Sequence, residues 1–258
     1  MSYTTITYYL AEQPLWPLVY LAGVAFVAAL ARGFSGFGGA LIFVPLVSAV
    51  FAPQVAAPIL MLVDGVLQLS LMKNAWRLGN RREVGIMALG ALAGIPLGVL
   101  ALKHLDSIVL RWGISGLTIA MLALLVSGWR YHGQPRPPLT AGVGFLSGLL
   151  SGAIQAGGPP VVAYWLGGGN AAATMRANII LFFFCTSIAS GLTYLVAGLL
   201  DVGVVILALV AMPGYALGLF LGTRMFRLAS EHSFRRACYL LIAAAAIISL
   251  PALDSILR

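Results

Sequence analysis

Long apolar runs are the feature of this sequence that most constrains its fold. They recur from Leu15 to Leu250 with only short polar connections between them. A helix needs roughly 20 consecutive apolar residues to cross the hydrocarbon core of a bilayer, and the runs reach that length. Hydrophobic residues make up 61% of the 258 positions and charged residues only 9%, which excludes a water-soluble fold and leaves no room for a soluble catalytic domain. We predict an all-α polytopic membrane protein whose surroundings are the lipid bilayer.

The few charged and reactive residues exclude several other classes of protein. The net charge of +8 does not indicate binding to nucleic acid, because the basic residues lie in short loops and form no continuous polar surface. Residues 1–13 lack the basic region and cleavage site of a secretory signal, so we expect the first apolar run to be retained. Cys185 and Cys238 each lie inside an apolar run, where cysteine behaves as a small hydrophobic residue.

The sequence contains an internal repeat with an offset of about 120 residues. Gly38-Gly39 recurs as Gly157-Gly158, and the glycines of 94–98 recur at 214–218. Each half reads as one apolar stretch interrupted by glycine and followed by three full spans. The interrupted stretches are 15–51 and 139–166, and the expected spans are 55–73, 84–102, 109–129, 173–199, 202–222 and 234–251.

The distribution of basic residues indicates whether an interrupted stretch crosses the membrane or returns as a hairpin. The loops 73–83 and 223–236 carry four basic residues each, so both should be cytoplasmic. A single crossing by the second stretch would place one of these loops outside, whereas a hairpin of two short helices keeps both inside. With hairpins the cytoplasmic side collects 11 basic residues, and the outer side keeps only Lys103, Arg111 and Arg258.

Each half then has an odd number of segments, two short and three long, so the second half is inserted upside down relative to the first. We predict two inverted repeats, each a broken-helix hairpin followed by three transmembrane helices, in a 5+5 arrangement. Residues 1–131 would form the first repeat and 138–258 the second, with 132–137 as the linker and both termini on the outer side. Inverted repeats with broken helices are typical of secondary transporters, which bind substrate near the midplane where the repeats meet.

Both glycine breaks are suited to an anion. Glycine lets the backbone turn, and the helix that follows points its N-terminus, with free N–H groups and a partial positive charge, at the turn. Glycine can instead merely allow close helix packing, but its recurrence beside both predicted breaks favours a binding site. The substrate contacts expected in the two breaks are Ser35, Gly36, Phe37, Gly38, Gly39, Gln155, Ala156, Gly157 and Gly158.

Arg32 is the one basic residue well inside an apolar stretch, and a charge there indicates function because it is costly in a membrane. It would either neutralise a bound anion or pair with Asp64, the only acid expected in the membrane interior. Asp64 is also a candidate for proton coupling, and Gln68 lies one turn further along the same face. Arg176 and Asn178 open a span beside the second hairpin and complete the expected set of substrate contacts, although Arg176 is alternatively only a topology anchor.

An enzymatic function is disfavoured by what the sequence lacks. The GxSG pattern of 33–36 matches the motif of intramembrane serine proteases, which need a histidine base nearby. His104, His132 and His232 all fall in loops near the membrane surface, so no base lies at the depth of Ser35. No Walker loop, dinucleotide-binding motif or metal-ligand cluster occurs, and we expect a protein that is not an enzyme and needs no cofactor or metal.

Three features together resemble a known family: GFSGFGGALIFVPL at 33–46, Gly-Gly-Pro-Pro at 157–160, and the paired glycines of 94–98 and 214–218. Their order and duplication resemble the sulfite exporter TauE/SafE family of membrane permeases for organosulfur anions, over roughly residues 18–250. The resemblance implies a carrier in the bacterial inner membrane for small sulfur-containing anions such as sulfite, sulfonates, sulfoacetate or thiosulfate. The family often has a fuller glycine run in the second half than this chain has at 156–160, which affects the shape of that half of the site.

Two transport mechanisms agree with this sequence. The leading hypothesis is a secondary transporter, an exporter or permease, that moves small anions by alternating access at a midplane site. The alternative is an uncoupled anion channel with the same site. The expected partners are the small anionic substrate, the bilayer and protons as a candidate coupling ion, with no nucleic acid.

Overall fold

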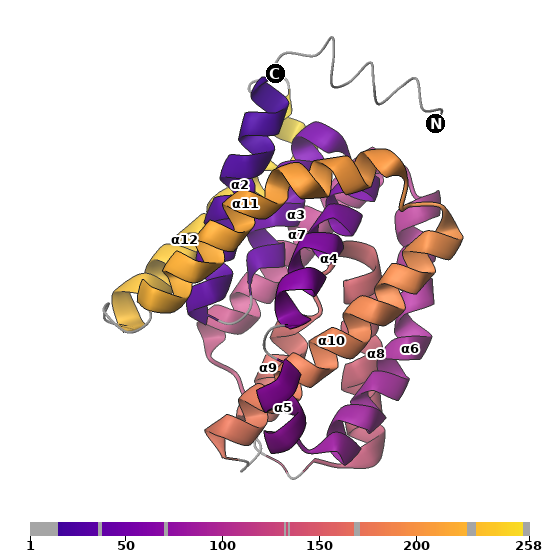
Figure 1. Cartoon of the computed structure of the whole chain (residues 1–258), viewed down its shortest axis with the longest axis vertical. Coiled ribbons are helices and arrows are strands. Elements are labelled where there is room, and N and C mark those ends of the chain that lie inside the picture. Colours follow the sequence, from indigo (N-terminus) through magenta and orange to yellow (C-terminus); the bar gives the residue numbers. More distant parts are fainter. Residues whose placement is uncertain are drawn as a thin grey trace.

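The protein is built from helices alone in the part of the chain that the structure describes (Figure 1). A computed structural model describes residues 15–35, 38–69, 72–131, 133, 135–167, 171–225 and 231–254. Within these ranges, six helices are long and apolar enough to cross a membrane: α2 (Trp16–Ser35), α6 (Arg81–His104), α7 (Ser107–Ser127), α8 (Pro137–Ile154), α10 (Ala172–Ala197) and α11 (Val202–Met225). The shorter elements are α3 (Gly39–Phe51), α4 (Pro53–Gln68), α5 (Met72–Leu78), α9 (Gly158–Gly167), α12 (Glu231–Ile248) and the 3₁₀ turn η2 (Pro251–Leu253). The predicted all-α membrane class is confirmed.

Acidic and amide side chains define where three of the long helices begin. Asn80 caps α6, Asp106 caps α7 and Asp201 caps α11. In each case a side-chain oxygen accepts a backbone N–H of the first turn, at 3.3, 2.8 and 2.8 Å respectively. These caps satisfy donors that the helix itself leaves unpaired. They lie between the apolar runs, so three of the polar connections fall where the sequence predicts loops.

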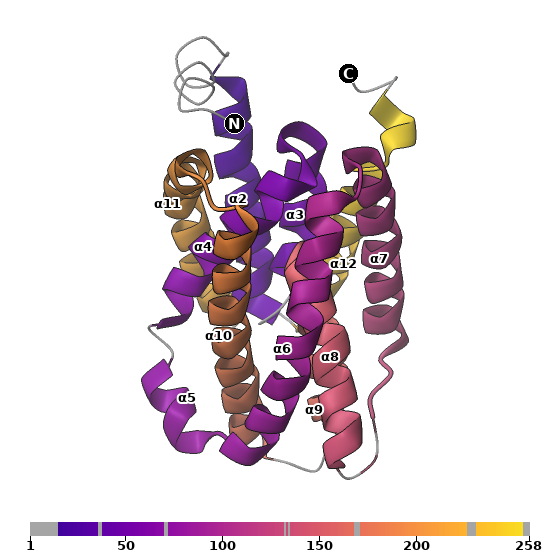
Figure 2. The same ribbon diagram turned by 90° about the vertical axis from the view of Figure 1, so that its right-hand side faces the viewer.

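Both glycine breaks interrupt the helical chain where predicted, and each separates a long arm from a short one. α2 gives way to α3 around Gly38, whose φ is 95°, and α8 gives way to α9 around Gln155, whose φ is 57°. The first arms have 20 and 18 residues, which is longer than the short helices expected. The second arms have only 13 and 10 residues, too few to cross about 30 Å of hydrocarbon at 1.5 Å per residue. Figure 2 shows α2 and α3 in its upper part and α8 and α9 in its lower part.

The predicted span 55–73 is two helices in the structure. α4 ends at Gln68, and α5 is a separate helix at the lower end of Figure 2. The predicted loop 73–83 therefore contains most of a helix. α5 buries Ala75 and packs against α10, while Lys73 and Trp76 are exposed. A single small buried residue per turn gives little apolar periodicity, which is why the sequence alone does not indicate this helix.

The long arm of each break packs against a long helix from the other half of the chain. α6 lies along α8, and α11 lies along α2. Glycine recurs at every fourth position on these helices, namely at Gly90, Gly94, Gly98, Gly144, Gly148, Gly152, Gly214, Gly218 and Gly222. A Cβ added at any of the nine would overlap a backbone oxygen of the facing helix. Small residues at this spacing allow backbones to approach closely in membranes, so the repeated glycines of 94–98 and 214–218 are packing residues.

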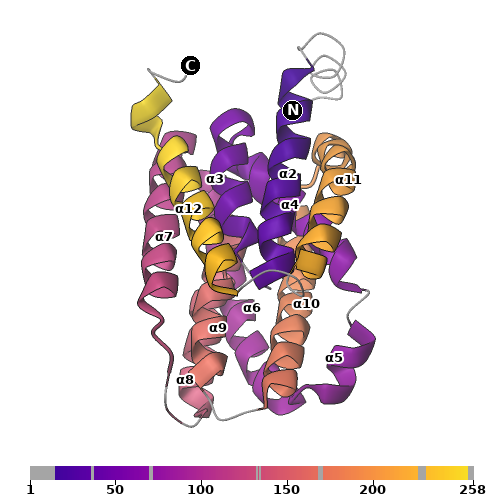
Figure 3. The same ribbon diagram turned by 90° about the vertical axis from the view of Figure 1, so that its left-hand side faces the viewer.

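The buried side chains form two apolar clusters. The first joins α2, α3, α4, α11 and α12, and the second joins α6, α9 and α10. In the second cluster Trp165 and Phe182 meet edge to face with ring centroids 6.1 Å apart. Figure 3 shows the first turn of α2 and η2 at the same end of the molecule.

Candidate functional site

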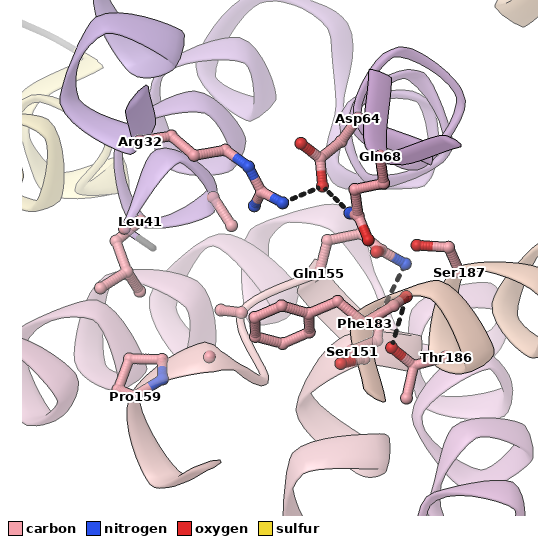
Figure 4. A pocket seen from close by; sticks show the side chains of 14 residues that line it. Arg32, Leu41, Asp64, Gln68, Ser151, Gln155, Pro159, Phe183, Thr186 and Ser187 are labelled. Carbon is pink, nitrogen blue, oxygen red and sulfur yellow. Dashed lines mark hydrogen bonds and ion pairs between the residues drawn. The ribbon is translucent and has the colours of Figure 1, made fainter. Parts of the chain in front are cut away.

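A small cavity lies where the two breaks meet, with walls from both breaks and from α4 and α10 (Figure 4). Its volume is about 30 Å³, whereas a single water needs on the order of 10–15 Å³ by the same measure. The space therefore suits a few atoms. Its lining residues are Arg32, Gly38, Ala40, Leu41, Asp64, Gln68, Ser151, Gln155, Ala156, Gly158, Pro159, Phe183, Thr186 and Ser187.

Arg32 and Asp64 form an ion pair on the wall of this cavity. The distance from Arg32 Nη2 to Asp64 Oδ2 is 2.7 Å, and the side chains are 18% and 14% exposed. The sequence left open whether Arg32 faces an anion or pairs with Asp64. In the structure it pairs with Asp64 while both residues line the cavity. Each charge compensates the other in a surrounding of low polarity, and both stay within reach of a small ligand.

Two further groups hold the Asp64 carboxylate. Gln68 Nε2 donates to Oδ2 at 2.6 Å, as their spacing on one helix face predicts. The hydroxyl of Tyr215, which is fully buried on α11, donates to Oδ1 at 2.9 Å. An ionised carboxylate only accepts hydrogen bonds, so all three contacts, including that of Arg32, suit the charged form. Residues from α2, α4 and α11 thus fix one carboxylate beside the cavity.

The N-termini of α3 and α9 both lie at the cavity. Gly38, which precedes α3, and Gly158, which begins α9, belong to the cavity lining. The first amides of a helix lack an acceptor within the helix and carry a partial positive charge. The two ends differ in one respect. α9 continues with Pro159 and Pro160, which have no N–H, so α3 supplies more backbone donors than α9.

A buried tyrosine of α10 fixes the second break. The hydroxyl of Tyr194 donates to the carbonyl of Gly152 at 2.8 Å. Gln155 Nε2 donates to the carbonyl of Ser151 at 2.8 Å and to the Tyr194 hydroxyl at 3.2 Å. Two fully buried tyrosines from the second half therefore support the cavity, Tyr215 through Asp64 of α4 and Tyr194 through Gln155 of the second break.

The lining follows the internal repeat. Four pairs of lining residues lie 119 positions apart, as Gly38 and Gly157 do: Arg32 and Ser151, Ala40 and Pro159, Asp64 and Phe183, and Gln68 and Ser187. Both charged members belong to the first half of the chain, and their counterparts are uncharged. The cavity is therefore built from matching positions but is electrostatically one-sided.

The structure brings together part of the predicted site. Five of the predicted substrate contacts line the cavity along with Asp64, namely Arg32, Gly38, Gln155, Ala156 and Gly158. Gly39 lies directly behind Arg32, because a Cβ there would come within 3.1 Å of the Arg32 Cβ. Gly157 is bound to α8 instead, its carbonyl accepting the Ser147 hydroxyl at 2.7 Å. Gly36, Phe37 and the side chain of Ser35 lie outside the described residues.

Two predicted contacts are not among the lining residues. Arg176 is exposed in the first turns of α10. Asn178 is fully buried, and its Oδ1 accepts the backbone N–H of Asn80 at 2.7 Å. Asn178 thereby fastens the start of α6 to α10.

Several residues of the site were not predicted. Ser151, Phe183, Thr186 and Ser187 line the cavity, and Tyr194 and Tyr215 support it. The repeat offset contained a usable signal, since 119 positions beyond Asp64 and Gln68 lie Phe183 and Ser187. The two tyrosines were also detectable as polar tips in otherwise apolar spans, where they need a partner. A second ion pair, between Arg111 and Asp254 at 2.6 Å, joins α7 to the end of η2 and is not part of the lining.

Known proteins resemble this chain along most of its length. The family described as Sulfite exporter TauE/SafE matches residues 21–248. A relative named "Probable sulfite/organosulfonate exporter TauE", from Cupriavidus necator, is 27% identical over 259 residues, which cover 93% of this chain and 97% of the relative. No solved structure matches the chain. Because the family match takes in both breaks and every residue that lines the cavity, the chain belongs to the sulfite exporter TauE/SafE family.

Proposed function

We propose that this protein is a secondary transporter, an exporter or permease, for small sulfur-containing anions such as sulfite, sulfonates or sulfoacetate. The observation that carries the proposal is the cavity between the two breaks, where Arg32 meets the N-termini of α3 and α9. A guanidinium and two helix ends attract an anion, and the volume of about 30 Å³ suits a small one. Membership of an exporter family, and the sulfite and organosulfonate in the name of the relative, support this substrate class.

We further infer an inverted 5+5 repeat with alternating access at this site. The repeats would be residues 1–131 and 138–258, joined by 132–137. Lining pairs 119 positions apart support this, and so do the matching contacts of α6 with α8 and of α11 with α2. In transporters of this architecture one set of helices moves against the other and opens a midplane site to each side in turn.

We infer the orientation in the membrane from the exposed basic residues. α5 and the first turns of α6, α8 and α10 lie at the lower end of Figure 2. They carry the exposed residues Lys73, Arg77, Arg81, Arg82 and Arg176, and the exposed Arg136 directly precedes α8. The positive-inside rule then places the lower end in the cytoplasm of a bacterium and both termini outside the inner membrane.

Asp64 is the proposed coupling group, because it competes with a substrate anion for Arg32. While Asp64 is ionised, its carboxylate neutralises Arg32 at 2.7 Å. A proton carried on Asp64 Oδ1, beside the Tyr215 hydroxyl, would remove that competing charge and leave the guanidinium to the anion, while Oδ2 still accepts from Gln68. Anion binding and protonation then favour each other, so anion affinity rises as the pH falls. Substrate contacts by Ser35, Gly36, Phe37, Gly157, Arg176 and Asn178 stay predictions.

Purified protein in proteoliposomes tests the proposal. A carrier gives saturable sulfite flux with counterflow, and an imposed pH gradient drives accumulation if protons are coupled. Sulfite flux without either behaviour would support the anion channel instead. A panel of sulfur oxyanions and sulfonates without any specific flux would contradict both.

A further inference from the structure

Gln68 carries an amide oxygen that the protein does not use. The residue is 94% buried, and it lines the cavity. Its Nε2 donates to Asp64 Oδ2 at 2.6 Å, whereas Oε1 has no hydrogen-bond partner among the described residues. The orientation of the amide is determined by its neighbour, because a carboxylate only accepts hydrogen bonds and must face the NH₂ group. Oε1 is thus a buried acceptor of fixed orientation on a residue that lines the cavity.

A second glutamine, Gln155, lines the cavity and has its amide nitrogen engaged by the protein. Gln155 uses its Nε2 for the Ser151 carbonyl and the Tyr194 hydroxyl. Figure 4 shows the side chains of Gln68 and Gln155 pointing toward one another, from α4 and from the second break. Both amide nitrogens are therefore engaged by the protein, and Gln68 Oε1 is left as an acceptor without a partner among the described residues. A site for an anion would not need such acceptors, since an anion is itself an acceptor.

The unused oxygen has an energetic consequence for any ligand. A ligand that fills the cavity without offering a donor would leave Gln68 Oε1 desolvated and unpaired, which is more costly than a missing contact. A site that hydrogen-bonds a substrate hydroxyl rejects analogues lacking it much more strongly than an apolar pocket rejects a lost methylene.

Resting on the proposed function, we propose that the site selects small monoanions that carry their own hydrogen-bond donor. Examples are bisulfite, through its acidic proton, and hydroxyalkanesulfonates, through their hydroxyl. The acid group would face Arg32 and the N-terminus of α3, and the donor would bind Gln68 Oε1. Gln68 is then a specificity-determining residue, with Asp64 and Arg32 setting its orientation and the charge requirement.

A pair of isosteric sulfonates tests this inference. Hydroxymethanesulfonate and ethanesulfonate have the same charge and similar size, and differ by a hydroxyl in place of a methyl group. We expect the hydroxyl compound to compete for sulfite counterflow with an affinity at least about threefold higher, the effect of one net hydrogen bond. Gln68→Leu should abolish this ratio. Gln54→Leu is the matched control on α4, because Gln54 contacts Leu105 and Ser107 instead of the cavity, and it should keep the ratio.

The ratio of the two sulfonate affinities distinguishes a role of Gln68 in recognising the ligand from a purely structural role. If Gln68 only braces Asp64, its replacement lowers both affinities together and leaves the ratio unchanged, which would overturn the inference. Equal affinities in the unaltered protein would also overturn it while leaving anion transport intact, and this result does not depend on any variant folding. If sulfite and both sulfonates all fail to bind, the proposed function itself is wrong. Gln68→Met serves as the second variant where Gln68→Leu does not fold, with the same expected loss of the ratio.

Discussion

At the scale of single residues, the site depends on one guanidinium shared between the protein and its ligand. Arg32 is engaged by Asp64 at 2.7 Å, and Asp64 is held in turn by Gln68 and Tyr215. The charges were predictable because charged residues are rare and costly in apolar runs. The pairing of Tyr215 with Asp64 was not predictable, since the two lie 151 positions apart and only the packing of α11 on α4 brings them together.

Replacing Arg32 and Asp64 one at a time distinguishes substrate binding from proton coupling. Arg32→Ala should weaken sulfite binding by about tenfold or more, the effect of one charged hydrogen bond, while Arg130→Ala, at an exposed position, should not. Asp64→Asn frees Arg32 and should make the binding of hydroxymethanesulfonate, whose charge is constant near neutral pH, independent of pH, whereas the unaltered protein should bind it more tightly as the pH falls. Equilibrium binding measured across pH checks both. A folded Arg32→Ala protein with normal binding would show that Arg32 is not a ligand.

At the scale of elements, the breaks and long helices follow from apolar run length and glycine, but the identity of the packing partners does not. Nothing in residues 81–104 indicates that α6 pairs with α8 instead of a neighbour in its own half. The pairing depends on glycines of both helices facing each other at every fourth position, a match that appears only once the two helices are side by side. The sequence did not predict α5 for a related reason. The buried part of this helix is mainly Ala75, and the helix packs against α10.

A single methyl group tests the contact of α6 with α8. A Cβ at position 94 overlaps the carbonyl oxygen of Phe145, so Gly94→Ala should lower the free energy of unfolding by about 1–3 kcal/mol through overpacking. Gly85→Ala is the control on the same helix, since a Cβ there meets nothing within 4 Å and alanine favours a helix by up to about 1 kcal/mol. Unfolding in detergent measures both. Equal stability of the two variants would contradict the close packing of these backbones.

At the scale of the whole molecule, the proposed hairpins make a topological claim that single cysteines can test. In a background of Cys185→Ser and Cys238→Ala, one cysteine each replaces Lys103, Arg130 and Ala171, which are all exposed. If α8 and α9 enter and return, positions 130 and 171 lie on one side and 103 on the other. A membrane-impermeant maleimide should label position 103 in intact spheroplasts, and the other two only after permeabilisation. Labelling of 130 and 171 from opposite sides would exclude the hairpin.

The pairing of α2 with α11 has a consequence for how the chain is made. α2 is the first described helix to leave the ribosome, whereas α11 is among the last. Until α11 has been synthesised, the face of α2 against which the glycines of α11 will pack has no partner helix there. The first half of the site therefore cannot be completed during its own synthesis, and its assembly must wait for the end of translation. A chain that stops before Val202 would lack both this partner and Tyr215, so we expect it to insert into the membrane without forming the site.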